Sequence, residues 1–420
     1  MLKKSKILLI FLPAVFLFTE IQSQNNTYSP YSRFGIGDIA KKGFGRNHAL
    51  GGIGFGLRDN NHINHLNPAS NSAQDTMSFI FSTGIIGNTM QMASNQSSHN
   101  VSNVTLSHLA IGFPVSRWWK SSFGLVPYSK MGYKIIDVDL ESEQYYDGSG
   151  GINQFFFGNA LKITNNISAG VNVSYLFGTL NQTRQLLFPL EDNIFSVNSK
   201  SRAMVGDFHF RYGLQYTGRI KEDYRFTIGG IYEIKTALKT DQDWLIINEL
   251  TSPSGPVRDT VLNYVASEST IELPASYGIG ASFSRDNKFL IGLDYSFQEW
   301  SETSFLNQQN DSLVNSSSIN FGVQYIPDHS DFRSYWKRIH YRMGVHYSDT
   351  YLELRGHQLK DYGITLGFGI PYGNSGTSFN FAVDIGRRGT KELNLIEENY
   401  VMFTLSLSLY DYWFFKRRYE

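Results

Sequence analysis

The chain has 420 residues, no cysteine, and 37 basic residues against 37 acidic ones. The missing cysteines exclude a lipoprotein anchor, thiolate metal sites and disulfides, and the neutral charge balance gives no electrostatic reason to expect nucleic-acid binding. Aromatic residues make up 15% of the chain and glycine 38 positions, while the mean hydropathy is −0.26. This composition is typical of a membrane β-barrel, in which every second residue faces lipid, although a soluble β-protein can share it.

The first 23 residues have the pattern of a secretory signal peptide. Lys3, Lys4 and Lys6 precede an apolar run over 7–18 that contains Pro13, and polar residues follow. A run of about a dozen residues is too short for a spanning helix, which needs roughly 20. We therefore expect 1–23 to be a signal peptide that is cleaved after Ser23 and directs the protein to export.

Residues 24–76 differ from the rest of the chain because they are rich in glycine and asparagine and show no alternation. Glycine allows close backbone approach and positive φ angles, which suit a compact, irregular segment. A barrel wider than eight strands cannot be filled by its own side chains. The segment 24–76 is therefore predicted to be a plug, or hatch, inside a barrel.

Period-two alternation dominates from residue 77 onward. Near the end of the chain, for example, Val401, Phe403 and Leu405 alternate with Met402 and Thr404. The pattern predicts an all-β fold, a transmembrane antiparallel β-barrel over 77–412 followed by a periplasmic tail over 413–420. About 14 strands are expected, near 77–87, 104–115, 121–134, 152–164, 166–178, 204–218, 223–239, 271–284, 288–302, 316–327, 338–349, 360–370, 378–388 and 400–410.

The connections between these strands alternate in length. Tight turns follow most even-numbered strands, and long polar stretches follow the odd-numbered ones. Outer-membrane barrels have short periplasmic turns, long external loops and an even strand number, so the alternation predicts an outer-membrane location with both termini periplasmic. A soluble β-sandwich is the alternative, but it gives no reason for long and short connections to alternate. The expected long loops are 88–103, 135–151, 179–203, 240–270, 303–315, 350–359 and 389–399, and the connection 328–337 is a longer exception on the side of the turns.

Several short motifs resemble the FadL family, the FadL/TodX-type transporters of long-chain fatty acids and hydrocarbons. The stretch 45–70 contains Gly51-Gly52 and closes with Asn67-Pro68-Ala69, like the hatch of that family. Similar matches along the barrel are 124–128, 272–274, 277–280, 300–301 and 342–345. Each motif is short, but together they cover nearly the whole chain after 23. Ser70 stands where the family commonly has glycine, and the chain continues past its final strand.

The resemblance implies two sets of functional residues. In this family the third strand has a kink that opens the wall sideways, so Pro127 is the candidate lateral gate; an ordinary proline at the barrel rim is the plain alternative. Asn67, Pro68 and Ala69 are the candidate hatch residues, with Asn67 and Pro68 fixing the segment by hydrogen bonding and by turn geometry. A simple helix cap or turn is the alternative for them.

Four apolar residues occupy strand positions that are predicted to face the lumen, where the other residues on the same face of the strand are mostly polar. They are candidates for a greasy pocket that binds an acyl chain. Contact with the hatch, or a slipped register, is the alternative explanation for each. These candidate ligand-binding residues are Leu176, Ile231, Leu290 and Met402.

Other chemistry is not indicated. His62 and His65 have helical ligand spacing but no complementing cysteine or carboxylate, so no metal site is expected. The glycines over 51–56 lack the strand-to-helix context of a nucleotide fingerprint, so no cofactor is expected. No Ser–His spacing stands above chance, and the protein is expected not to be an enzyme.

Two functions from different classes remain. The first is passive uptake of hydrophobic molecules such as long-chain fatty acids, in which the partners are outer-membrane lipids and a hydrophobic small-molecule ligand. The alternative is a FadL-like accessory barrel of an envelope secretion or assembly complex, such as the shuttle barrel of the type IX secretion system, whose long external loops at 179–203 and 240–270 would bind envelope protein partners.

Overall fold

The computed structural model describes residues 29–188, 194–252, 255–309, 312–331, 333–373 and 376–412. The predicted signal peptide 1–23 and the predicted tail 413–420 lie outside the described residues. Within them, no helix is long and apolar enough to cross a membrane.

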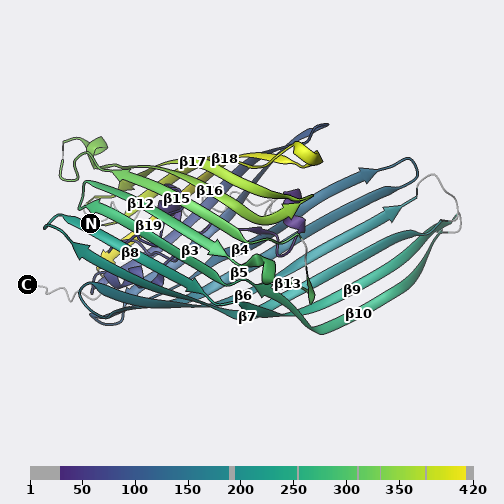
Figure 1. The fold of residues 1–420 in the computed structure, drawn as a ribbon, viewed down its shortest axis with the longest axis horizontal. Helices are drawn as coiled ribbons and strands as arrows, with labels where there is room; N and C mark the ends of the chain where they lie inside the picture. The colour runs from purple at the N-terminus through teal and green to yellow at the C-terminus, as the bar shows by residue number, and fades with distance from the viewer. Residues whose placement is uncertain are drawn as a thin grey trace, which may run out of the picture.

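The described chain forms a closed antiparallel β-barrel (Figure 1). One sheet of 19 strands closes on itself where the last strand pairs with β2, from Ser78↔Tyr412 to Ala93↔Glu397. Three of the strands, β1, β13 and β14, have two residues each, and two pairs, β8 with β9 and β10 with β11, are each one wall strand with a short interruption. This leaves 14 wall strands, which confirms the predicted fold class.

The wall consists of long strands that each pair with the next along the chain. Their bounds are β2 Ser78–Ala93, β3 Ser98–Pro114, β4 Trp119–Val138, β5 Glu143–Lys162, β6 Ile167–Leu187, β7 Ser196–Arg219, β8 Tyr224–Glu233, β9 Thr236–Ser252, β10 Gly255–Leu273, β11 Ser276–Arg285, β12 Phe289–Gln298, β15 Ser316–Tyr325, β16 His340–Leu354, β17 His357–Pro371, β18 Ser378–Gly389 and β19 Glu397–Tyr412. The short strands β13 Ser304–Phe305 and β14 Gln308–Gln309 and the 3-10 helices η3 Trp300–Glu302, η4 Tyr335–Arg338 and η5 Glu392–Asn394 lie between them.

The alternation in the sequence follows the two faces of the wall. On β19, Phe403, Leu405 and Leu409 are exposed on the outside, while Thr404 and Ser408 are buried inside. An outer face of apolar and aromatic side chains with a polar lumen is the arrangement that a bilayer requires of a barrel.

The predicted long loops were largely wrong, because most of their residues belong to strands. The stretches 135–151, 179–203 and 240–270 extend the hairpins β4–β5, β6–β7 and β9–β10, and 88–103 is mostly β2 and β3. Ladder hydrogen bonds continue beyond the apolar band because they need only a neighbouring strand and not an apolar face. The wall therefore projects on one side, where β9 and β10 extend farthest in Figure 1.

The N-terminal segment, residues 29–77, packs against the lumenal face of the wall. It contains the 3-10 helix η1 (Pro30–Arg33), β1 (Asp38–Ile39), the one-turn helix α2 (Gly45–His48) and the 3-10 helix η2 (Pro68–Ala73). Its middle residues Leu50, Ile53 and Ala69 are at most 1% exposed. This part meets the wall at inward-facing glycines, which stand on consecutive strands from β6 to β8 and again from β12 to β17; some of them meet its backbone and the others its side chains.

These wall glycines, called the glycine ring here, leave no room for a side chain. A Cβ on Gly229 would lie 1.9 Å from Phe55 O, and one on Gly344 would lie 2.3 Å from Gly51 N. Such distances are far below van der Waals contact, so only glycine permits this fit. The members are Gly170, Gly213, Gly229, Gly292, Gly322, Gly344 and Gly367.

Candidate functional site

The wall has a break between β3 and β4. The two strands pair only from Leu109↔Leu125 to Pro114↔Lys120. Beyond Leu125, β4 pairs with β5 up to Val138, and β3 pairs with β2 down to Ser98. Two neighbouring strands therefore diverge for most of their length in a barrel that is otherwise closed.

Proline and two bulges coincide with the start of this break. Pro127 lies two positions after Leu125, the last residue of β4 that pairs with β3, and it has no N–H to donate to a ladder. The β4–β5 register shifts between Pro127 and Ser129, and the β3–β2 register shifts at Ser107, beside Gly84 and Ile85. A bulge bends its strand and increases the local twist, so bulges on both sides of the seam turn the two strands apart.

The N-terminal segment takes the place of β3 along β4. β1 pairs antiparallel with β4 through Ile39↔Ser129 and Asp38↔Lys130, and Ala40 N donates to Tyr128 O at 3.0 Å. Farther along, the backbone N–H of Gly132 donates to Ser32 Oγ at 3.1 Å, and that hydroxyl lies 3.0 Å from Gly132 O. The free edge of β4 is thus covered from Tyr128 to Gly132 by the protein's own N-terminal segment.

Cavities lie on both sides of the break. An outer one of about 410 Å³ and an inner one of about 140 Å³ are both lined by Thr105, Pro127 and Lys130. Lys130 Nζ donates to Thr105 Oγ1 at 2.7 Å, so one side-chain contact spans the seam. A further cavity of about 250 Å³ shares Lys41 and Met402 with the inner one and continues into the lumen.

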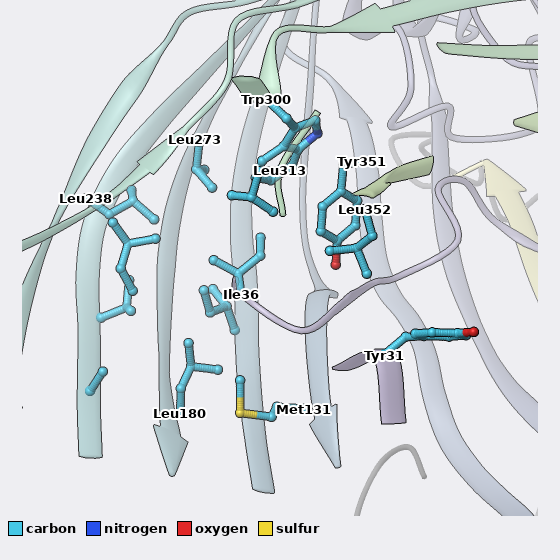
Figure 2. Close-up of a cluster of buried hydrophobic side chains, with 14 of the residues drawn as sticks. Tyr31, Ile36, Met131, Leu180, Leu238, Leu273, Trp300, Leu313, Tyr351 and Leu352 are labelled. Carbon is cyan, nitrogen blue, oxygen red and sulfur yellow. The ribbon is translucent and has the colours of Figure 1, made fainter. Parts of the chain in front are cut away.

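The lumen beside the break holds a large apolar cluster, to which the N-terminal segment contributes Tyr31 and Ile36 (Figure 2). Trp300 and Tyr351 lie on the wall side of this cluster with ring centroids 4.9 Å apart, and Tyr351 donates to the backbone carbonyl of Gly37 at 2.5 Å. The buried members are Tyr31, Ile36, Met131, Tyr133, Ile152, Leu176, Leu180, Ala203, Val205, Leu238, Ile271, Leu273, Trp300, Leu313, Tyr351, Leu352, Leu359 and Leu395. The protein's own side chains therefore occupy the apolar volume that a hydrophobic ligand would use.

Ion pairs hold the N-terminal segment next to this cluster. Arg388 on β18 pairs with Asp38 at 3.0 Å and with Glu398 at 2.5 Å. Lys41 pairs with Asp384, also on β18.

The predicted hatch residues lie in the second part of the N-terminal segment, residues 44–74, which is called its lower part here. Asn67 is fully buried; its Oδ1 accepts from Ala69 N at 3.1 Å, and its Nδ2 donates to Phe55 O at 2.9 Å. Pro68 is the first residue of η2, and Ala69 approaches Gly170 on β6. Asn67 therefore both caps η2 and links it to the turn at Phe55.

The four predicted lumen residues do not share one pocket. Leu176 belongs to the large apolar cluster. Ile231 packs with Phe55 and Leu66, and Leu290 packs with Leu50, Ile53 and Leu57, so both contact the N-terminal segment. Met402 alone of the four lines the cavities behind the break.

The sequence reasoning missed the ion pairs of β18. The sequence did contain a signal for them. Asp384 lies between the outward-facing Val383 and Ile385, so its side chain faces the lumen. Glu398 likewise faces the lumen, because it lies an odd number of positions before the outward-facing Val401 and Phe403. Charged residues at inward positions of a barrel strand need partners. His62, considered for a metal, lies instead beside Asp59 and Ser378, and no metal-binding group of three ligands occurs within the described residues.

The fold is that of the solved FadL/TodX-type barrels. It superposes on the toluene transporter TbuX of Ralstonia pickettii with a TM-score of 0.60 at 15% identity, over 87% of this chain and 97% of that one. The toluene transporter TodX of Pseudomonas putida gives 0.58 at 13% identity, over 91% and 99%. A FadL homologue of Pseudomonas aeruginosa gives 0.59 at 11% identity, over 89% and 99%.

The family model of BamG matches residues 1–420, and the chain belongs to the BamG family. Comparison with curated proteins found no match. The expected resemblance is thus confirmed in the fold, while the family itself is BamG.

Proposed function

We propose that the protein admits hydrophobic molecules passively through the break between β3 and β4. The observation that supports this most is the end of the β3–β4 ladder at Leu109↔Leu125, with cavities on both sides of the seam. The toluene transporter TbuX and the monoaromatic hydrocarbon channel CymD share the fold, which agrees with a hydrophobic cargo. Long-chain fatty acids are the cargo we would test first. The proposal includes no catalytic step and no cofactor.

The route that we propose turns sideways inside the barrel. The lower part of the N-terminal segment acts as the plug, because its backbone packs against the glycine ring and closes the straight path. Cargo enters from the projecting side, displaces Tyr31 and Ile36 from the apolar cluster, and leaves through the seam into the bilayer. Pro127 serves as the lateral gate by keeping the ladder from extending. In the orientation that we propose, the projecting hairpins face the outside of the cell, and the short turns and both termini are periplasmic.

A reversible lock of the seam tests the route. The chain has no cysteine, so Thr105→Cys with Lys130→Cys places the only two thiols on opposite sides of the break. Uptake of radiolabelled oleate by cells carrying this variant should fall at least fivefold when a short bis-thiol crosslinker bridges the pair. A cleavable crosslinker should restore uptake after reduction. Unchanged uptake with the bridge shown to be complete by mass spectrometry would overturn the route.

Replacement of the gate proline gives a second test. Pro127→Val should let β3 and β4 pair further and reduce oleate uptake. Pro114→Val is the matched control, because Pro114 lies at the paired end of the same seam, opposite Lys120. Equal uptake by both variants would count against a gate at Pro127.

A second function is an accessory barrel of an envelope complex. Membership of the BamG family and an apolar lumen already filled by Tyr31 and Ile36 are the observations that support this second function. The projecting hairpins β6–β7 and β9–β10 would then hold protein partners. Native mass spectrometry of the protein extracted from its own membrane separates the two functions: stoichiometric protein subunits support the accessory function, and a retained lipid on a monomer supports transport.

A further inference from the structure

The outer cavity at the wall break is a polar recess on the lipid-facing side of the wall. Asn153 on β5 is exposed and points outward, in the same row as Phe155 and Phe157. On β6, Thr179 and Asn181 continue the outward row of Tyr175 and Phe177. The outward rows of both strands therefore change from aromatic to polar within one step of the ladder, since Asn153 stands opposite Phe177 and Thr179 opposite Gly151, as expected near the edge of a bilayer.

Glycines shape this recess. Gly150, Gly151 and Gly178 line it and present no side chain, and Gly150 and Gly151 have φ of 115° and 152°. The volume of about 410 Å³ is larger than that of the cavities inside the lumen described above. It can hold a polar group of several heavy atoms, well beyond single waters.

The chemistry of the recess favours an anionic, acceptor-rich group. Among the described residues, Lys130 is the only charged one that lines it and no carboxylate does, while Leu106, Leu125 and Pro127 form its apolar lining. Arg202 on β7 is the exposed cross-strand neighbour of Asn181. Within the described part of the chain, Asn153, Thr179 and Asn181 make no side-chain hydrogen bond, and Lys130 forms no ion pair. These donors are thus available to phosphate and hydroxyl oxygens.

Apolar side chains border the recess on its membrane side. Phe155 on β5 and Tyr175 on β6 are 46% and 41% exposed there, and Leu106 on β3, which is 45% exposed, lines the recess itself. A polar hollow with apolar walls below it matches an amphiphile whose head sits in the hollow while its chains lie along the barrel. We infer that the recess binds the phosphorylated sugar head of an outer-leaflet glycolipid. This inference rests on the outer-membrane location in the proposed function, and binding of the glycolipid does not require that the protein transports cargo.

Lipid A is a suitable probe, because it carries phosphates on a glucosamine disaccharide with acyl chains. The recess variant combines Asn153→Leu, Thr179→Val and Asn181→Leu. The control variant combines Thr89→Val and Gln91→Leu, the same kind of change at exposed, outward-facing positions of β2. Folding of both is checked by the heat-dependent gel mobility of intact barrels.

Native mass spectrometry in detergent then measures the bound fraction of lipid A. The wild type and the control variant should each retain one lipid A, and the recess variant should lose at least fivefold in bound fraction. Dephosphorylated lipid A should bind the wild type several-fold less well. Equal binding to all three proteins would overturn the inference, as would retention of oleate in the recess with no retention of lipid A. Lipid A retention is measured in the absence of oleate, so failure of this inference and failure of the transport proposal are seen separately.

Discussion

The two halves of the N-terminal segment are held in different ways. The lower half, residues 44–74, is fixed by backbone contact with the glycine ring and by buried hydrogen bonds, such as those that Asp294 accepts from Gly54 N at 2.6 Å and Phe55 N at 2.8 Å. The upper half, residues 29–42, has side chains in an apolar cluster, a two-residue strand on β4, and ion pairs from Asp38 and Lys41 to β18. Apolar contacts can be exchanged for those of a hydrophobic ligand, whereas a buried amide has no such substitute. We therefore propose that the lower half is a fixed plug and the upper half the movable part.

The glycine ring gives the largest expected effect. Gly229→Ala places a Cβ 1.9 Å from Phe55 O, whereas the adjacent Gly230→Ala meets nothing nearer than Gly278 O at 3.8 Å. The first should cost about 3 kcal/mol of stability or prevent assembly, and the second should be close to neutral. Urea unfolding in detergent, followed by tryptophan fluorescence, measures both. Equal stability of the two variants would contradict the close packing of the lower half against the glycine ring.

Asn67 should have the next largest effect. Asn67→Ala removes the acceptor for Ala69 N and the donor to Phe55 O, and should lower the free energy of unfolding by about 2 kcal/mol. Asn67→Ser keeps a capping oxygen and should recover part of that loss. If both variants match the wild type, the cap contributes nothing to the plug.

The upper half should respond more weakly. Ser32→Ala removes the hydroxyl that meets both backbone groups of Gly132 and should cost about 1 kcal/mol. Because the β4 edge is then less well covered, hydrogen exchange at Gly132 should rise while exchange at Gly54 and Phe55 stays unchanged. Faster exchange at Phe55 as well would mean that the two halves move together.

The smallest effect is a pH dependence in the lower half. Burial, with a smaller contribution from Lys41, lowers the pKa of His48 from 6.5 to about 4. The folded protein keeps this histidine neutral, so its contribution to stability is full above pH 6.5 and is lost as the pH falls toward 4. Between pH 7 and 6 the loss should be roughly 0.5–1 kcal/mol. His48→Gln should remove this slope; an unchanged slope would assign the pH dependence to another group.

The strands of the barrel wall could be predicted from the sequence more accurately than the packing of the N-terminal segment inside the barrel. Alternation such as that of Val401, Phe403 and Leu405 is local, so strands and their lipid-facing side could be predicted from it. Pro127 marked the position of the break because a missing N–H is also a local property. The projecting hairpins were mistaken for loops, since outside the bilayer a strand needs no apolar alternation.

Long-range pairing explains what could not be predicted. The ion pair of Arg388 with Asp38 joins residues 350 positions apart, and the fit of Gly344 to Gly51 depends on the path of the N-terminal segment inside the barrel. In the sequence, each of these contacts is visible only as a charged residue or a glycine at a position that faces the lumen. For the same reason Ile231 and Leu290, predicted for a greasy pocket, could not be distinguished from residues that contact the plug.

Hydrogen exchange with mass spectrometry, with and without saturating oleate, tests the central claim most directly. The ligand should increase exchange over 29–42, and most clearly at Asp38 to Ala40, while 44–74 keeps its protection. Loss of protection in 44–74, or no response in 29–42 while oleate is bound, would contradict a fixed plug with a movable upper half.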